Sequence, residues 1–286
     1  MKYLDNYCWL LKEKLLKTGF VNEDDISGFK MKKMEKNLYV EMSGETLKQY
    51  KNGDGNELSD GKMNMIRSSS AMIYNLLGNG NVTISGNDKK IPSGTFNKEF
   101  EKKLPTLKRS PKKANLDAWL SNSNSEIFIE SKCLEWIENG HEKELREAYT
   151  NRERYYDSSI ADTFIKLGLQ IPQTQYDSCQ MFKHTLAIYN YLKKEQPEKE
   201  KICLLNIIYE PSIHELPKEI QQNFQNQLEL EHKEFRDFYN LMLPIINEIN
   251  TNMDYEFDIK YLSVKDFCAM LEYSDKKQAA FIQRYL

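Results

Sequence analysis

Residues 115–132 constrain the fold of this chain most strongly, because two apolar runs there are separated only by a polar turn. The first run covers Asn115 to Leu120, the second covers Ser125 to Lys132, and Ser-Asn-Ser-Asn joins them. Two strand-like runs joined by so few turn-forming residues predict an antiparallel hairpin. The second run contains an Ile-Phe-Ile triplet with polar flanks, which is typical of a central strand. The chain is therefore expected to build a sheet around this hairpin.

Helix-like and strand-like segments alternate around the hairpin. We predict helices where apolar residues recur at helical spacing and strands where short apolar runs occur. Helices are predicted at 63–77, 141–152, 157–167, 176–193 and 217–250, and strands at 95–104, 201–209 and 257–264. Loops rich in Gly and Asn are predicted at 52–61 and 78–94. This order predicts an α/β protein with a central mixed sheet, plus N-terminal and C-terminal helices.

Length and composition indicate a folded protein with one main core. The chain has 286 residues, of which 40% are hydrophobic and 29% charged. That length suffices for one core plus an appendage, so residues 1–62 are interpreted as an N-terminal helical segment packed on a domain at 63–286. No apolar run approaches the roughly 20 residues of a membrane helix, so no membrane partner is expected. Charged residues interrupt the first twenty positions, which favours a cytoplasmic protein over a secreted one.

The cysteines indicate neither a disulfide framework nor a zinc site. The five cysteines are scattered, and no two have the Cys-x-x-Cys spacing of a metal module. Buried, reduced thiols are the expected state.

Basic residues are concentrated between Lys89 and Lys113, although the whole chain has a net charge of −3. From Glu195 onward the balance becomes acidic. A local basic segment fits contact with nucleic-acid phosphates, and it equally fits a solvated basic face. If phosphates are bound, the residues immediately before the hairpin are the candidates, namely Lys108, Arg109, Lys112 and Lys113.

Two acids and a lysine occupy one end of the predicted hairpin. Side chains two positions apart on a strand share a face, so Glu130 and Lys132 point the same way. Pairing within the hairpin brings Asp117 beside them. Two carboxylates are ligands that Mg²⁺ prefers, with water and a substrate phosphate completing its shell, and a lysine can stabilise developing negative charge. By itself the Glu-x-Lys triplet also fits an exposed Glu–Lys pair, so spacing leaves both interpretations open.

Further motifs follow one another in a definite order. A helix reads Arg-Ser-Ser-Ser-Ala-Met-Ile-Tyr-Asn-Leu-Leu over 67–77, and a strand contains Phe100-Glu101. The hairpin supplies Leu116-Asp117-Ala118 and Ile129-Glu130-Ser131-Lys132, with Glu135 beyond. A later helix contains Cys179-Gln180-Met181-Phe182-Lys183-His184, and a strand follows over 202–211. With this ordered set, residues 65–271 resemble the PD-(D/E)XK nuclease superfamily, in particular restriction-endonuclease-like families with a Ser-Ser-x-Ala helix.

The resemblance implies a fold, a site and an activity. It implies a restriction-endonuclease-like three-layer α/β/α core that hydrolyses DNA phosphodiester bonds with Mg²⁺, for which Mn²⁺ is an accepted substitute. Asp117 and Glu130 would be metal ligands, Lys132 the catalytic lysine and Gln180 an orienting residue, with Glu101 as an additional acid. DNA is then the expected partner, and a homodimer is left open. The match departs from the pattern at Leu116, which replaces a proline, and at Lys183, where some relatives have arginine.

Three alternatives stay open at the level of sequence. His184 shares a helix face with Gln180, and a packed or surface histidine is favoured over a catalytic one. The chain could instead be a non-catalytic nucleic-acid-binding or regulatory protein that retains the nuclease fold, although all three core residues are present. A helical interaction protein built on residues 217–250 is a third interpretation.

Overall fold

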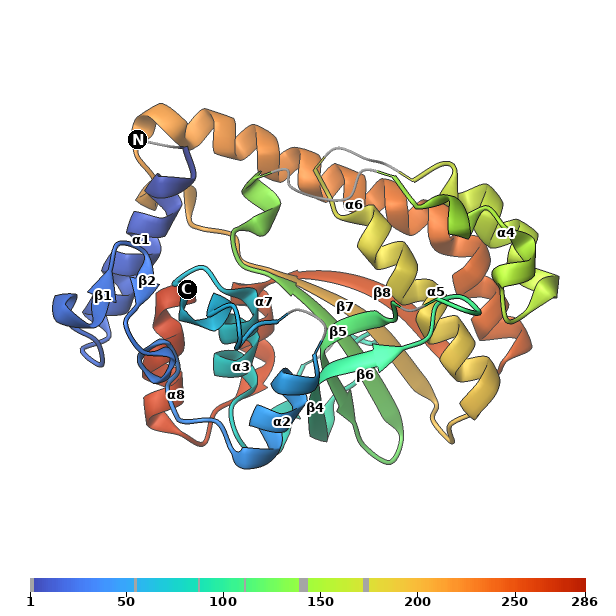
Figure 1. The fold of residues 1–286 in the computed structure, drawn as a ribbon, viewed down its shortest axis with the longest axis horizontal. Helices are drawn as coiled ribbons and strands as arrows, with labels where there is room; N and C mark the ends of the chain where they lie inside the picture. Colours follow the sequence, from blue (N-terminus) through green and yellow to red (C-terminus); the bar gives the residue numbers. More distant parts are fainter. Residues whose placement is uncertain (1–2, 54–55, 87, 111, 139–143, 172–174) are drawn as a thin grey trace.

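A seven-stranded mixed sheet organises the fold in a computed structural model of the chain (Figure 1). The structure describes residues 3–286 except 54–55, 87, 111, 139–143 and 172–174. Within these residues the strand order is β8-β7-β6-β5-β4-β3-β9, in which β6, β7 and β8 are parallel and the other neighbours antiparallel. The strands are β3 (Val82–Ile84), β4 (Gly94–Leu104), β5 (Ala114–Ser121), β6 (Ser125–Lys132), β7 (Lys201–Ile208), β8 (Glu256–Ser263) and β9 (Leu271–Glu272). A separate ribbon pairs β1 (Ile26–Ser27) with β2 (Lys30–Met31).

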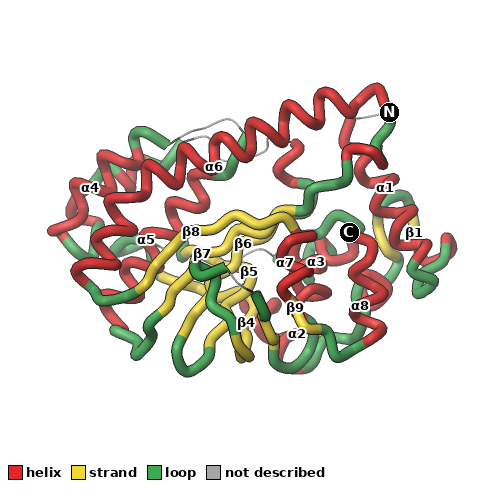
Figure 2. Tube along the Cα trace, turned by 180° about the vertical axis from the view of Figure 1, so that it is seen from behind, coloured by secondary structure: helices red, strands yellow, loops and turns green. Residues whose placement is uncertain are grey.

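Helices cover both faces of this sheet. One face packs against α4 (Ser158–Gly168), α5 (Ser178–Glu195) and α6 (Lys218–Asn252), and these elements share one hydrophobic cluster. The other face packs against a second cluster, to which the remaining helices contribute: α1 (Tyr3–Lys17), α2 (Gly44–Asn52), α3 (Ser69–Leu77), α7 (Val264–Met270) and α8 (Lys276–Ile282). Figures 1 and 2 show α1 and α4 at opposite ends of the molecule, with α6 running between those ends. The predicted three-layer α/β/α core with a mixed sheet is therefore confirmed.

Burial explains why the central strands form where they do. Every residue of β6 except Lys132 and every residue of β7 except Lys201 is buried, as expected for strands covered on both faces. In β5 buried and half-buried residues alternate instead. The Ile-Phe-Ile triplet of β6 sends side chains to both clusters, because Ile127 and Ile129 join one and Phe128 the other. The hairpin of β5 and β6 is thus the centre of the core.

Burial alternates along the whole of β5, but the face of the sheet to which its side chains point changes at Asp117. Leu116 and Trp119 both pack against the α4–α5–α6 cluster, although residues three apart on a regular strand point to opposite faces. On β4, Glu101 has a left-handed backbone with φ of 57°. Pairing of β4 with β5 runs through Phe100↔Ala118 and Lys102↔Leu116 and omits the position between them. The sheet is distorted at Glu101 and Asp117.

Three predicted elements differ from the structure. The helix predicted over 141–152 is wrong for its described part, residues 144–152, while 141–143 lie outside the described residues. Short 3₁₀ helices occur at Glu147–Tyr149 and Arg152–Arg154, because the Asn151 side chain accepts a hydrogen bond from the Glu153 amide and starts a new turn. The helix predicted from residue 63 begins only at Ser69, since the Ser68 hydroxyl caps it. The predicted loop at 78–94 contains the edge strand β3.

The N-terminal segment shares its core with the rest of the chain. Tyr7, Leu11 and Leu15 of α1 are fully buried in the same cluster as Ile207 of β7. The boundary at residue 62 stays a prediction. Within the described part of the chain, no helix combines the length and the apolar character needed to cross a lipid bilayer.

Removal of a central core side chain should destabilise the fold. Leu204 of β7 is fully buried, so Leu204→Ala should lower the free energy of unfolding by about 2–5 kcal/mol. Leu169 is 70% exposed, and Leu169→Ala should change that free energy by at most about 0.5 kcal/mol. Urea denaturation of both variants checks the assignment of the core. Equal effects of the two substitutions would contradict it.

Candidate active site

Glu130 and Lys132 form a buried ion pair on the α5 side of β6. The Lys132 Nζ lies 2.8 Å from Glu130 Oε1, and the Glu130 side chain is only 3% exposed. The backbone carbonyl of Glu130 also accepts a hydrogen bond from the side-chain amide of Asn206 on β7, at 3.1 Å. Parallel pairing with β7 continues to the end of β6, through Lys132↔Ile208. The strand that carries the pair is thus held rigidly on its β7 side.

Asp117 lies where β5 and β6 stop pairing. The last pair of this ladder is Ala118↔Ile129, so the next position on each strand, Asp117 and Glu130, lies just beyond it. Asp117 Oδ2 accepts hydrogen bonds from both the amide and the hydroxyl of Ser131, each at 2.7 Å. The aspartate is therefore fixed to β6 through Ser131 rather than through Lys132.

The N-terminal end of α5 packs over the Lys132 ammonium and supplies it with acceptors. Gln180 Oε1 accepts a hydrogen bond from Lys132 Nζ at 2.5 Å. Asp177 caps α5 by accepting the Gln180 amide, and its Oδ2 lies 3.4 Å from the same ammonium. Three acceptors from two elements therefore surround the Lys132 ammonium. The structure brings Gln180 to the position where an orienting residue was predicted.

His184 belongs to the same cluster. Its Nε2 lies 3.0 Å from Glu130 Oε2, and the residue is 1% exposed. Of the two non-catalytic alternatives for this histidine, packed or surface, the structure shows the packed one. The sequence signal for its contact with the site was the four-residue spacing from Gln180, which places both side chains on the α5 face above β6.

Glu101 lies across β5 from the ion pair. Its Oε2 accepts a hydrogen bond from the Asn115 amide at 2.5 Å, and its side chain lies directly against Gly53. A Cβ at position 53 would collide with the Glu101 carboxylate, so a larger residue there would have to displace this side chain. Burial raises the pKa of Glu101 to about 7, and the nearby carboxylates of Glu57 and Glu130 add to the increase. Glu101 as an additional acid stays a prediction.

Burial and mutual repulsion set the protonation of the three central groups. Burial raises the pKa of Asp117 well above its usual value, and the charges of Glu130 and Glu101 raise it further. Burial acts in the same direction on Glu130, but Lys132 and His184 outweigh it and lower the pKa of Glu130. The pKa of Lys132 is raised, because attraction to Glu130 and Asp177 outweighs burial. Glu130 and Lys132 are thus charged, and Asp117 favours its proton.

The donor set fits a divalent cation that takes several ligands from water. Among the described residues, no three His, Cys, Asp or Glu side chains form a group able to hold a metal ion. The two neighbouring carboxylates of Asp117 and Glu130 are hard oxygen donors, and a cation between them would relieve the repulsion that raises the pKa of Asp117. Mg²⁺ commonly uses only one or two protein carboxylates.

Glu234 of α6 holds the backbone that leads into the site residues of α5. The sequence analysis did not identify this residue. Its Oε2 accepts the backbone amides of Gln175 and Tyr176, both at 2.8 Å, and the residue is buried. These amides immediately precede Asp177, so the carboxylate holds the turn that leads into α5. Glu231, one helical turn earlier, lines a cavity of about 10 Å³ beside Lys132. Because both partners of Glu234 are backbone groups, no residue type in the sequence signals the contact.

The predicted phosphate-binding residues lie on the loop between β4 and β5. Lys108, Arg109, Lys112 and Lys113 are all exposed. The Arg154 guanidinium donates hydrogen bonds to the Lys108 and Arg109 carbonyls, which holds this loop against residues 152–154. The four predicted residues are exposed and can contact an anion. That role stays a prediction.

Loss of the Glu234 carboxylate should destabilise the turn before α5. In Glu234→Ala two buried amides lose their acceptor, at a cost of about 1–3 kcal/mol for each amide left unsatisfied. Urea denaturation should show this loss in the free energy of unfolding. Glu229→Ala, an exposed change on the same helix, is the matched control and should be nearly neutral.

The raised pKa of Glu101 predicts a specific pH dependence of stability. The folded state retains the Glu101 proton between the usual value of 4.5 and about 7. The contribution of Glu101 to the free energy of unfolding should therefore be fully present below pH 4.5. This contribution should be lost as the pH rises from 4.5 through about 7. Glu101→Gln, which cannot ionise, should gain stability relative to the wild type across that window. Urea denaturation in the presence of EDTA at several pH values measures the difference, and parallel curves would refute the assignment.

The whole site lies within one recognisable protein family. A family model described as "Restriction Endonuclease associating with ARP" matches residues 19–286, which include the complete seven-stranded sheet and all the site residues described above. Searches of curated proteins and of solved structures found no match. A match over most of the chain establishes membership. The chain belongs to this restriction-endonuclease-like family and is a nuclease-like protein.

Proposed function

We propose that the protein is a metal-dependent nuclease that hydrolyses phosphodiester bonds of DNA. One observation carries the proposal: Asp117 and Glu130 follow the last pair of the β5–β6 ladder, Lys132 forms an ion pair with Glu130, and Ser131, between the two, holds Asp117. The family supports nuclease-like chemistry. The ordered motifs that resemble PD-(D/E)XK nucleases add the specific roles.

Each residue has a defined task in this proposal. Asp117 and Glu130 would hold Mg²⁺, or Mn²⁺ in its place, and the bound cation would stabilise charge on the phosphate and make water easier to deprotonate. Lys132 donates to the negative charge that develops on the phosphate or orients the attacking water. Gln180 and Asp177 keep its ammonium charged and in place, and His184 fixes the Glu130 carboxylate.

The local basic charge suits a nucleic-acid backbone, and the restriction-endonuclease-like family favours DNA as that nucleic acid. The exposed loop residues Lys108 and Arg109, with Lys112 and Lys113, would contact backbone phosphates near the acids. The description of the family also names an association with ARP, and we include such an association in the proposal. A homodimer and a cytoplasmic location are parts of the proposal that rest on sequence alone.

A non-catalytic nucleic-acid-binding protein is the second candidate, and one observation favours it. Both Glu130 carboxylate oxygens already accept hydrogen bonds, from Lys132 and from His184. A cation at this carboxylate would have to compete with these donors, and the described residues supply no third acidic, His or Cys ligand. This candidate predicts salt-sensitive DNA binding without cleavage in any divalent metal.

A cleavage assay on plasmid and linear DNA separates the two candidates. The wild type should cleave in Mg²⁺ and not in EDTA. Asp117→Asn and Lys132→Gln should each lower the rate by about 100-fold or more, because each removes a group that acts on the reacting phosphate.

The control for this assay is Lys194→Gln, which removes an exposed lysine of α5 and should leave the rate unchanged. Cleavage at the wild-type rate by both site variants would refute the site. Binding without cleavage in Mg²⁺ and in Mn²⁺ would favour the non-catalytic candidate.

A further inference from the structure

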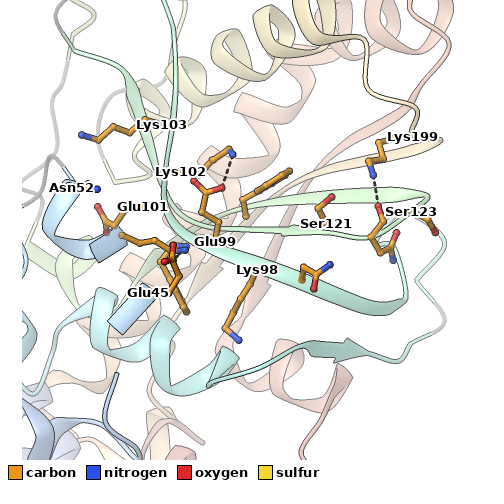
Figure 3. A pocket seen from close by; sticks show the side chains of 15 residues that line it. Glu45, Asn52, Lys98, Glu99, Glu101, Lys102, Lys103, Ser121, Ser123 and Lys199 are labelled. Carbon is orange, nitrogen blue, oxygen red and sulfur yellow. Dashed lines mark hydrogen bonds and ion pairs between the residues drawn. The ribbon is translucent and has the colours of Figure 1, made fainter. Parts of the chain in front are cut away.

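A polar groove runs along β4 away from the candidate site. It has a volume of about 830 Å³, and its walls come from α2, β4 and the turn between β5 and β6. Figure 3 shows Glu101 at one end of the groove, Ser123 and Lys199 at the other, and Lys98 between them. Glu101 and Asp117 are the two residues that the β4–β5 register skips. Glu101 therefore marks the end of the groove that lies nearest to Asp117 along the strands.

The groove exists because one edge of β4 lacks a neighbouring strand. The short strand β3 pairs only with residues 94–96 of β4, which leaves the edge of residues 97–104 without a partner strand among the described residues. Along this edge the Phe100 amide donates to Gln49 Oε1 of α2, at 2.9 Å. An extended peptide added to the edge would need that amide, so the groove is poorly suited to strand addition.

Two lysines in the groove have no carboxylate partner among the described residues. The ammonium of Lys98 donates to the carbonyl of Gly80, and the ammonium of Lys199 donates to the carbonyl of Asn122. A neutral carbonyl orients an ammonium without neutralising it, although Lys199 also interacts electrostatically with the nearby Glu126 carboxylate. By contrast, Lys102 is neutralised by Glu99, at 2.8 Å, and stacks over Trp119.

The remaining features of the groove also suit an anion. Burial lowers the pKa of Lys98 to about 8, so a bound phosphate would restore its full charge. Glu101 has a pKa of about 7, which reduces its repulsion of a phosphate. Amide and hydroxyl groups also line the wall, among them Asn52, Asn97, Ser121 and Ser123, while Glu45 of α2 adds a carboxylate on one side.

We propose that this groove binds the sugar-phosphate backbone of one nucleic-acid strand, with Lys98 and Lys199 contacting phosphates on one side of the phosphodiester held at Asp117 and Glu130. The four residue steps of β4 from Asn97 to Glu101 span about 13 Å. At a rise of about 3.4 Å per nucleotide, this length corresponds to about four nucleotides. The proposal rests on the proposed function for the identity of the strand.

The test measures how DNA binding depends on salt. Wild-type protein and Lys98→Gln/Lys199→Gln bind short labelled single-stranded and duplex DNA in EDTA, over about 50 to 200 mM salt. Each lost phosphate contact should reduce the slope of log K against log salt by about 0.7 for a single strand or about 0.9 for a duplex. The double variant should therefore lose about 1.4 or about 1.8 from the slope.

Two further double variants serve as controls. Lys98→Arg/Lys199→Arg keeps both charges and should keep the wild-type slope. Lys265→Gln/Lys276→Gln removes two exposed lysines outside the groove and should do the same. If the first double variant does not fold, Lys199→Gln alone should lose about 0.7 or about 0.9.

Each outcome addresses the groove separately from catalysis. An unchanged slope in the Lys98→Gln/Lys199→Gln protein overturns the groove assignment, even if the wild type cleaves DNA. A wild type that binds no DNA also overturns it. The expected loss of slope in a protein that never cleaves supports the groove and refutes only the proposed nuclease activity.

Discussion

The buried carboxylate of Glu130 needs compensation, and most of the polar structure at this end of the sheet follows from that need. A charged group removed from water is tolerated only when opposite charge and hydrogen bonds replace its hydration. Lys132 and His184 supply these from the same strand and from α5. Lys132 is half-buried and takes Gln180 and Asp177 as acceptors, while Glu234 of α6 holds the turn before Asp177. One buried charge thus determines how two helices lie on the sheet.

Strand pairing is incomplete at two places that matter for function. The β5–β6 ladder ends at Ala118↔Ile129, and Asp117 and Glu130 are the next residue on each strand. The Asp117 carboxylate there accepts the Ser131 amide and hydroxyl instead of lying beside a regular ladder. The short length of β3 leaves an open edge on β4, along which the groove forms. Incomplete pairing thus marks both the candidate site and the groove.

Negative charge is concentrated around Asp117. Burial raises the pKa of Asp117 and of Glu101, and the charged Glu130 carboxylate raises both further, whereas Lys132 and His184 keep the pKa of Glu130 low. Such a cluster costs stability in the folded state, and a divalent cation or protonation would relieve it. Carboxylates whose pKa values are strongly shifted by burial and by neighbouring acids are more typical of functional sites than of purely structural ones.

The hairpin, the central strands and the placement of Glu130 beside Lys132 could be predicted from the sequence, because strand alternation and turn composition are local properties. The long helix over residues 218–252 could be predicted for the same reason. The conformation of residues 144–152 could not be predicted. This segment has too few apolar residues for their spacing to distinguish an α-helix from short 3₁₀ turns. The partners of His184, Glu234 and Lys199 also could not be predicted, because they lie 54 or more positions away and two of the three contacts are to backbone groups. The sequence by itself determined which acids and which lysine share the hairpin. Only the tertiary structure decided where strand pairing stops and which helix residues reach the ion pair, because both depend on how the two helical layers pack on the sheet.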